Sequence, residues 1–196
     1  MTRYIAFLRA INVGGHVVKM DYLRQQFESL GFTSVETFIA SGNVIFESAS
    51  QDSTALDGSI AARLQATLGY EVATFIRTAA ELAEIAHYQP FPAADQQGAT
   101  LYIAFLAEPL DQEAQQKLMA FRSPVDEFHT HNREIYWLCR VRSSESEFSL
   151  AKLEKALRTQ ATFRNSTTVQ KIAATSPFHR VETGVNRFHT SFSSGG

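Results

Sequence analysis

The sequence of 196 residues predicts an α+β protein made of two similar units in tandem, and three observations support this prediction. Short apolar runs, which are typical of strands, alternate with segments whose apolar residues recur at helical spacing. The order of these segments in the first half recurs in the second half, without recognisable sequence identity between the halves. A stretch rich in proline and polar residues, Pro90–Gly98, separates the two halves.

Four strands are expected in the first half. The first is apolar at nearly every position, and the second alternates between apolar and polar residues. Ser41-Gly42 makes a tight turn that joins the second strand to the third as a hairpin. The four strands are expected at Tyr4–Ala10, Ser34–Ala40, Asn43–Glu47 and Glu71–Arg77.

Two helices are expected to connect these strands. The first covers about Lys19–Leu30, with apolar residues on one face and Gly31 as a C-terminal stop. Asp52 or Ser53 caps the second helix, which Gly69 ends. The resulting order of strand, helix, strand, strand, helix, strand is that of the ferredoxin-like fold, also called the α/β plait.

The second half is expected to repeat this order. Thr78-Ala79-Ala80-Glu81 is typical of a capping box, and it begins a connecting helix that ends before Pro90. Further helices are expected from about Asp111, over Ser149–Arg158 and over Thr167–Ala174. The strands of this half are expected at Thr100–Leu106, Val125–Thr130, Glu134–Arg140 and Ala161–Phe163.

The expected organisation is therefore an N-terminal ferredoxin-like domain with its connecting helix over 1–90, a linker over 91–98, and a C-terminal ferredoxin-like domain over 99–176. Residues 177–196 lack periodicity and end in Ser-Ser-Gly-Gly, which predicts a flexible tail. The first strand of each unit is apolar on both faces, so the sheet faces are expected to be largely buried. The helices are expected on the outside of the sheets. The companion unit, or a partner chain in a homodimer, would cover the face that the helices leave open.

Composition excludes several classes of protein. Hydrophobic residues make up 44% and charged residues 19%, as in an ordinary globular protein, and the net charge of −2 argues against a nucleic-acid-binding protein. The single Cys139 cannot form an intrachain disulfide, and the apolar run after Met1 is too short for a signal peptide or a membrane span. The expected location is the cytoplasm, without membrane association.

The most informative stretch lies between Tyr4 and Phe46, where two polar turns that contain glycine follow strong strand signals. In a sheet with the strand order 4-1-3-2, both turns emerge at the same end of the sheet. Free backbone N–H groups before a helix favour an anion, and nearby basic and amide side chains would add to this preference. The candidate ligand-binding residues are Arg9, Asn12, Gly14, Gly15, Lys19, Ser41, Gly42 and Asn43, with Arg164 and Asn165 as additions from the second half.

The alternative interpretation of this corner is structural. Glycines permit the positive φ that tight turns require, and Asn12 can form hydrogen bonds with the local backbone. The sequence contains neither the GxGxxG fingerprint of dinucleotide-binding proteins nor the GxxxxGK[ST] motif of P-loop proteins, so no cofactor is expected.

Several segments resemble a known family. They are YIAFLRAINVGG at Tyr4–Gly15, Lys19-Met20, SGNVIFES after Ala40, EIYW at Glu134–Trp137, and TFRN at Thr162–Asn165. Together they resemble the bacterial family catalogued as domain of unknown function 1697, over roughly Tyr4–Ala174. The resemblance implies a two-part α/β architecture of plait type and no established activity. The chain departs from the family pattern at Ser166-Thr167, where a tryptophan and an asparagine usually stand.

No standard catalytic or metal-binding pattern is present. His129 and His131 would share one face of a strand, but no third ligand stands at a typical spacing, so no metal site is expected. RNA binding on a plait requires exposed aromatics on the sheet, which this sequence does not supply. The leading hypothesis is binding of a small anionic or nucleotide-like ligand at the N-terminal corner. The alternatives are an enzyme for group transfer or hydrolysis that uses the same pocket, and a nucleic-acid-binding protein.

Overall fold

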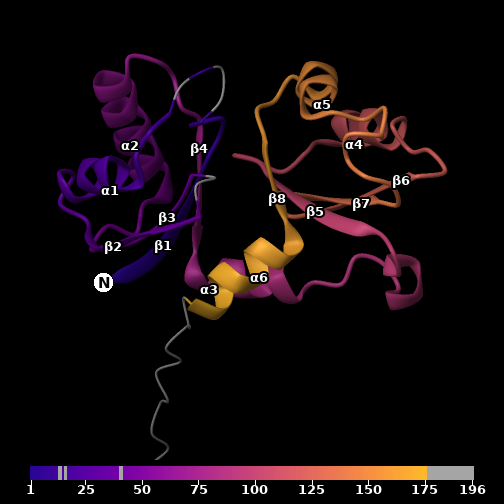
Figure 1. Cartoon of the computed structure of the whole chain (residues 1–196), viewed down its shortest axis with the longest axis horizontal. Coiled ribbons are helices and arrows are strands. Elements are labelled where there is room, and N and C mark those ends of the chain that lie inside the picture. Colours follow the sequence, from indigo (N-terminus) through magenta and orange to yellow (C-terminus); the bar gives the residue numbers. More distant parts are fainter. Residues whose placement is uncertain (13–14, 16, 40–41, 176–196) are drawn as a thin grey trace, which may run out of the picture.

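The computed structural model describes residues 1–12, 15, 17–39 and 42–175, and it shows an α+β protein with two four-stranded antiparallel sheets (Figure 1). Gly14, Ser41 and the predicted tail over 177–196 lie outside the described residues. The elements of the first half are β1 (Thr2–Leu8), α1 (Met20–Glu28), β2 (Thr33–Phe38), β3 (Asn43–Ser48), α2 (Ser53–Leu68) and β4 (Thr74–Thr78).

The second half repeats the order of the first, after a helix that connects them. The connecting segment contains helix α3 (Ala79–His87) and a short 3₁₀ helix (Ala93–Gln96). The elements of the second half are β5 (Thr100–Phe105), α4 (Gln112–Met119), β6 (Asp126–His131), β7 (Glu134–Cys139), α5 (Leu150–Leu157), β8 (Thr162–Asn165) and α6 (Ser166–Thr175).

Both sheets have the strand order that the sequence predicts. The order is β2-β3-β1-β4 in the first sheet and β6-β7-β5-β8 in the second, and every neighbouring pair is antiparallel. The first and third strands of each half therefore lie in the centre of their sheet. Because β8 runs to Asn165, Arg164 lies within this strand, whereas the sequence pattern predicts that the strand ends at Phe163.

Side-chain alternation along the central strands divides the interior into three layers. Tyr4, Ala6 and Leu8 on one face of β1 pack against α1 and α2, and β5 and β7 present an equivalent face to α4 and α5. Ile5 and Phe7 on the opposite face of β1 pack against the second sheet. Burial of each large apolar side chain contributes about 1.5–3 kcal/mol, which accounts for strands that are apolar on both faces.

The layer between the sheets confirms that the inner faces are buried against each other. Phe7 and Phe105 are both fully buried, and their rings stack with centroids 3.9 Å apart. The second half of the chain itself covers the inner face of the first sheet. Open-sheet base stacking therefore has no platform on the inner faces.

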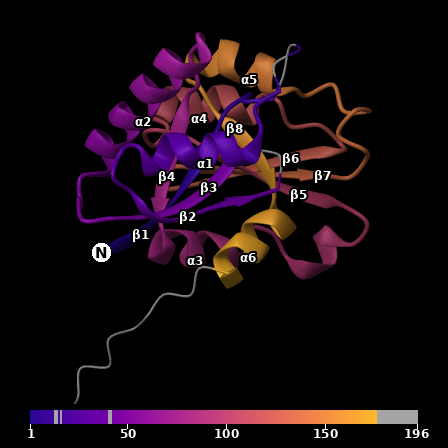
Figure 2. The same ribbon diagram turned by 60° about the vertical axis from the view of Figure 1, so that its left-hand side comes forward.

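The prediction that the helices lie outside the sheets is wrong for α3 and α6. Both views show these two helices side by side, along one edge of the layer between the sheets (Figures 1 and 2). Leu82 and Ile85 of α3, together with Val169 and Ile172 of α6, belong to the core of that layer. The two helices close this edge because their apolar faces pack onto both inner faces at once.

Local sequence signals explain where the helices begin. The side chains of Asp52, Asp111 and Ser149 accept hydrogen bonds from the first backbone N–H groups of α2, α4 and α5. Thr78 and Glu81 form the predicted capping box at the start of α3. None of the helices among the described residues is both long and apolar enough to cross a membrane.

Candidate ligand-binding sites

The predicted N-terminal corner is partly organised by its own local contacts. Asn12 accepts a hydrogen bond from the backbone N–H of Val18 at 2.7 Å, which links Asn12 to the residues just before α1. Gly15 and Gly42 adopt φ angles of +86° and +74°, in the left-handed region that favours glycine. Lys19 occupies the N-cap position of α1 and is exposed. These contacts agree with the structural interpretation of the two turns.

The space around the two glycines predicts different costs of substitution. A Cβ atom at Gly42 would lie 2.7 Å from Cγ2 of Ile11 and 3.1 Å from Cβ of Leu8, whereas nothing lies within 4 Å of one at Gly15. Gly15→Ala should therefore lower the free energy of unfolding only by the strain of a positive φ, about 1–2 kcal/mol. Gly42→Ala should lower it by at least about 1 kcal/mol more, because the steric clash adds to the strain. Urea denaturation of both variants checks this, and equal costs would contradict it.

Arg9 reaches the second half of the chain. Its Nε and Nη2 groups donate to the two carboxylate oxygens of Glu154 in α5, at 2.7 and 2.6 Å. These hydrogen bonds raise the pKa of Arg9, and the backbone N–H of Ala161 donates to the same carboxylate at 2.9 Å. Arg9 is thus held in one orientation, with 32% of its side chain exposed.

Arg164 joins the second half to the predicted corner. Its Nε donates to Oδ1 of the fully buried Asn43 at 2.6 Å, and its Nη2 donates to the carbonyl oxygen of Leu8 at 2.9 Å. Burial lowers the pKa of Arg164 to about 10, so the side chain remains a cation at neutral pH. Asn165 lies elsewhere, where its side chain accepts from the backbone N–H of Thr167 at the start of α6. The structure therefore brings Gly42, Asn43 and Arg164 together inside the protein.

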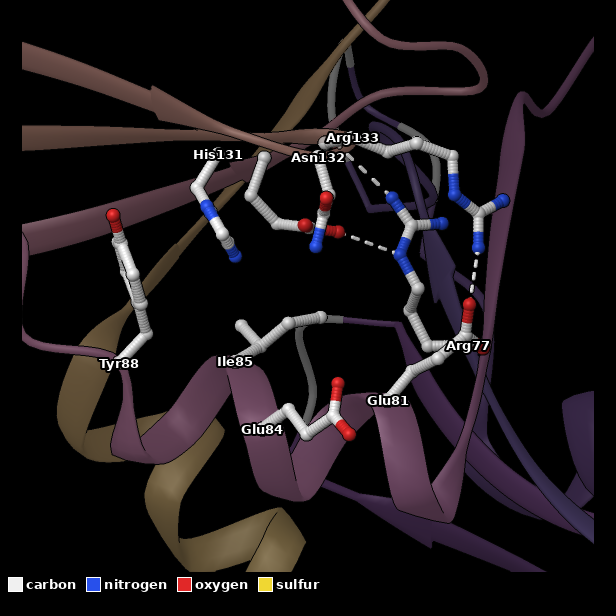
Figure 3. Close-up of a pocket in the computed structure, with 9 residues that line it drawn as sticks. Arg77, Glu81, Glu84, Ile85, Tyr88, His131, Asn132 and Arg133 are labelled. Atoms are coloured by element: carbon white, nitrogen blue, oxygen red, sulfur yellow. Dashed lines mark hydrogen bonds and ion pairs between the residues drawn. The ribbon is translucent and has the colours of Figure 1, made fainter.

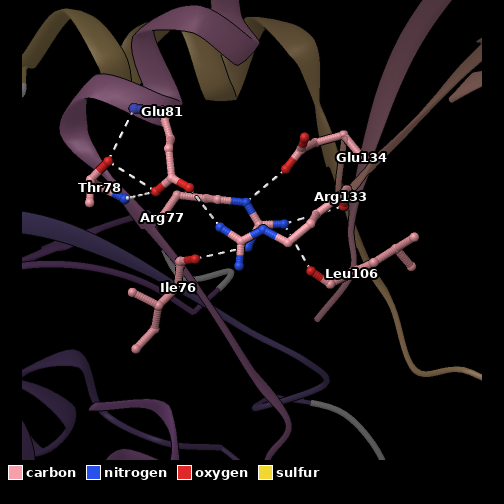
Figure 4. A network of polar contacts seen from close by, with 7 residues as sticks. All are labelled: Ile76, Arg77, Thr78, Glu81, Leu106, Arg133 and Glu134. Atoms are coloured by element: carbon pink, nitrogen blue, oxygen red, sulfur yellow. Dashed lines mark hydrogen bonds and ion pairs between the residues drawn. The ribbon is translucent and has the colours of Figure 1, made fainter. Parts of the chain in front are cut away.

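An equivalent arginine, Arg77 in β4, crosses in the opposite direction (Figure 4). Its Nε donates to Oε1 of Glu134 at 2.7 Å, and its Nη2 donates to the carbonyl oxygens of Leu106 and Arg133. Burial lowers the pKa of Arg77 and raises that of Glu134, and the attraction between the two charges opposes both shifts. Arg77 is 1% exposed, so this ion pair lies in the interior between the halves.

The two arginines occupy equivalent positions in the two halves, and this equivalence was not among the predictions from the sequence. Arg77 stands opposite Ile5 of β1, and Arg164 stands opposite Ile103 of β5, at the same position in the register. Their guanidinium groups lie over Phe105 and Phe7 respectively. The signal was present in the sequence, because Tyr4–Leu8 and Tyr102–Leu106 both read Tyr-Ile-Ala-Phe-Leu. The identity between the halves is therefore local and falls on the strands that face each other.

A cavity of about 280 Å³ lies between α3 and the turn from β6 to β7 (Figure 3). Glu81, Glu84 and Ile85 line it on the helix side, and His131, Asn132 and Arg133 line it on the turn side. Tyr88 borders the cavity; its ring stacks on His131 with centroids 4.1 Å apart, and its hydroxyl lies 2.8 Å from Nε2 of His129. The two histidines considered as metal ligands, His129 and His131, thus both contact Tyr88. The described residues contain no cluster of three metal-ligating side chains.

A second cavity, of about 450 Å³, lies beside Arg9 on the outer face of the second sheet. Aromatic side chains dominate its walls, and Ser149 stands at the start of α5 beside it. We call it the aromatic groove, and its main lining residues are Arg9, Tyr102, Trp137, Phe148, Ser149 and Phe163. Of the predicted site residues, Arg9 lines this groove.

Comparison with known proteins identifies a family and a fold. The family described as "Protein of unknown function (DUF1697)" matches residues 1–136. None of the curated proteins matches the chain. The structure of the conserved bacterial protein SP0830 from Streptococcus pneumoniae is similar, with a TM-score of 0.74 and 23% identity over 90% of this chain and 98% of that one. At this identity the similarity establishes the fold alone. Because the family match covers more than half of its residues, the chain belongs to the DUF1697 family.

Proposed function

We propose that the protein binds a small anionic, nucleotide-like ligand in the aromatic groove beside Arg9. The observation that supports this most is that one cavity combines a wall of aromatic rings with a fixed, partly exposed arginine. The proposal keeps the ligand class that the sequence suggested. It moves the site from the predicted corner to the adjacent groove, because Asn43 and Arg164 are buried between the halves.

The rings of the groove are suited to a planar ligand. Tyr102 stacks on Trp137 with centroids 4.8 Å apart, and Phe148 and Phe163 meet Trp137 edge-on at 4.8 and 5.7 Å. These contacts fix the orientation of the rings before a ligand arrives. Tyr102 and Phe163 are only partly buried, so their surfaces are available for stacking. Stacking of one base on an aromatic side chain contributes about 1–3 kcal/mol.

Arg9 and the start of α5 are suited to the anionic group. Of the five N–H donors of an arginine, Glu154 engages two, which leaves three without an acceptor among the described residues. Ser149 and Leu150 line the same groove at the N-terminus of α5, where backbone N–H groups and the helix dipole favour an anion. A phosphate at this end of the groove would thus meet both a guanidinium and a helix N-terminus.

We also propose that each half be classified as ferredoxin-like, with domain boundaries near the linker over 91–98 and a cytoplasmic location. The shared element order and the antiparallel strand order support this classification. An enzyme that acts in the same groove is the main alternative function, and a nucleic-acid-binding protein is the other.

Trp137 is the only tryptophan in the chain, so its fluorescence reports directly on the groove. Titration with adenosine monophosphate should change the emission of Trp137 and raise the melting temperature. A ligand at a hundred times its Kd stabilises a protein by about 2.7 kcal/mol. If neither quantity responds to adenosine monophosphate, to other nucleotides or to sugar phosphates, the proposal is wrong.

Two variants separate the contributions of the anionic group and the ring. Arg9→Ala should lower the affinity for adenosine monophosphate by at least about tenfold, or 1.4 kcal/mol, and leave the affinity for adenosine unchanged. Phe163→Ala should lower the affinity for both compounds. Arg140→Ala is the matched control, because it also removes an arginine from an ion pair, at 2.8 Å from Glu127 and outside the groove. Turnover of a bound compound would favour the enzyme, and steeply salt-dependent binding of oligonucleotides would favour nucleic acid.

A further inference from the structure

The cavity between α3 and the turn from β6 to β7 has opposite charges on its two walls. Glu81 and Glu84 of α3 form an acidic wall. The opposite wall carries the donors of Asn132 and Arg133, and also the carboxylate of Glu134, whose charge is paired with Arg77. In Figure 3 the Asn132 amide points from the turn toward α3, and Glu84 lies on α3, on the opposite side of the gap. Ile85 and the ring of Tyr88 supply apolar surface between the two walls.

The internal ion pairs of this cavity leave one acid without a partner. Arg77 is paired with Glu134, and Arg133 is paired with Glu81, each at 2.7 Å. The second carboxylate oxygen of Glu81 accepts from the backbone and the hydroxyl of Thr78. Glu84, in contrast, has no hydrogen bond or ion pair from its side chain to any residue that the structure describes. It is therefore the group that an incoming cation would meet.

Donors remain free on the opposite wall. Arg133 uses one of its five N–H donors for Glu81, and the Asn132 amide has no hydrogen-bond partner among the described residues. The backbone of Asn132 has a positive φ of 50°, which directs this turn residue differently from its strand neighbours. The volume of about 280 Å³ lies just below the range of about 300–1,000 Å³ that is typical of pockets for drug-sized ligands.

We infer that this cavity binds a small zwitterion, a free amino acid with an apolar side chain. Glu84 receives the ammonium group, Asn132 and Arg133 receive the carboxylate, and Ile85 and the Tyr88 ring contact the side chain. The stacking of Tyr88 on His131 and its contact with His129 hold this ring in place before binding. The site is separate from the aromatic groove and shares no lining residue with it.

Isothermal titration calorimetry of the full chain with L-leucine and L-phenylalanine tests this inference. At least one of them should bind. Isoamylamine and isocaproate, or phenethylamine and phenylpropionate, lack one charged group each, and both members of the pair should bind at least tenfold more weakly than the amino acid. Saturation with adenosine monophosphate should leave amino-acid binding unchanged, because the two sites are separate. Failure of both amino acids to bind, or binding of the amine alone that equals binding of the amino acid, would overturn the inference.

Glu84→Gln is the decisive variant. It should lower the affinity for the amino acid at least tenfold. It should leave the melting temperature unchanged, because Glu84 is exposed and makes no side-chain contact that the fold needs. Glu147→Gln is the matched control, since Glu147 is also exposed and lies outside the cavity lining. Full binding by Glu84→Gln would show that the acidic wall does not receive the ammonium group. The same variant should keep normal nucleotide affinity, so the two proposals can fail independently.

Discussion

Replacing Arg77 with alanine is expected to lower the free energy of unfolding by about 3–5 kcal/mol, because it leaves Glu134 as a buried charge without its partner. Arg77 also satisfies the carbonyl oxygens of Leu106 and Arg133, in the half of the chain opposite its own. The buried carbonyl oxygen of Leu106 would lose this donor at the same time, while that of Arg133 would keep the backbone N–H of Leu106. Guanidinium denaturation followed by circular dichroism measures the change.

Two further variants show whether the buried ion pair is the cause. Glu134→Gln keeps an acceptor for Arg77, much as the amide of Asn43 accepts from Arg164, so it should cost less than Arg77→Ala. Arg140→Ala removes an arginine from a partly exposed pair and should cost no more than about 1 kcal/mol. If Arg77→Ala costs as little as Arg140→Ala, the pair does not hold the two halves together.

Replacing Phe7 with alanine is expected to cost about 3–5 kcal/mol and to destabilise both halves together. Phe7 belongs to β1, yet its ring stacks on Phe105 of β5 at 3.9 Å in the layer between the sheets. Removal of the ring leaves a cavity in this layer, which both inner faces line. Trp137 lies in the second half, so its fluorescence reports the unfolding of the half that the mutation does not change.

Two measurements separate the coupling between the halves from the stacking of the two rings. The unfolding midpoint of Phe7→Ala should be equal when it is followed by Trp137 fluorescence and by circular dichroism. The double variant Phe7→Ala/Phe105→Ala should differ from the sum of the single variants by about 0.5–1.5 kcal/mol, as expected of aromatic rings in contact. An unchanged Trp137-detected midpoint in Phe7→Ala would show that the halves unfold independently.

Much of the secondary structure could be predicted because its signals are local. The signals are the apolar run Tyr4–Leu8, the capping box at Thr78 and Glu81, and the caps at Asp52 and Asp111, and each depends on residues close together in the chain. The antiparallel strand order followed from the sequence of elements. The burial of both faces of the central strands followed from their apolar character, because such strands require cover on each side.

The candidate site could be predicted only in part, because partners far apart in the chain decide where polar side chains point. Arg9 was expected to face the corner, but it pairs with Glu154, 145 residues away. Arg164 and Asn43 are 121 residues apart, and their hydrogen bond turns a predicted ligand-binding pair into a contact between the halves. The aromatic groove brings together residues of β5, β7, β8 and the end of β1, a combination that no short motif records.

The α+β class, the order of the elements and the burial of the central strands follow from the sequence. These depend on periodicity, on caps and on apolar content, which are properties of neighbouring residues. Three features depend on contacts between distant parts of the chain: the two sheets pack face to face, α3 and α6 close one edge, and Arg77 and Arg164 cross between the halves. The arginines cross because a buried charge must find its acceptors wherever the fold provides them, and here they lie on the opposite half.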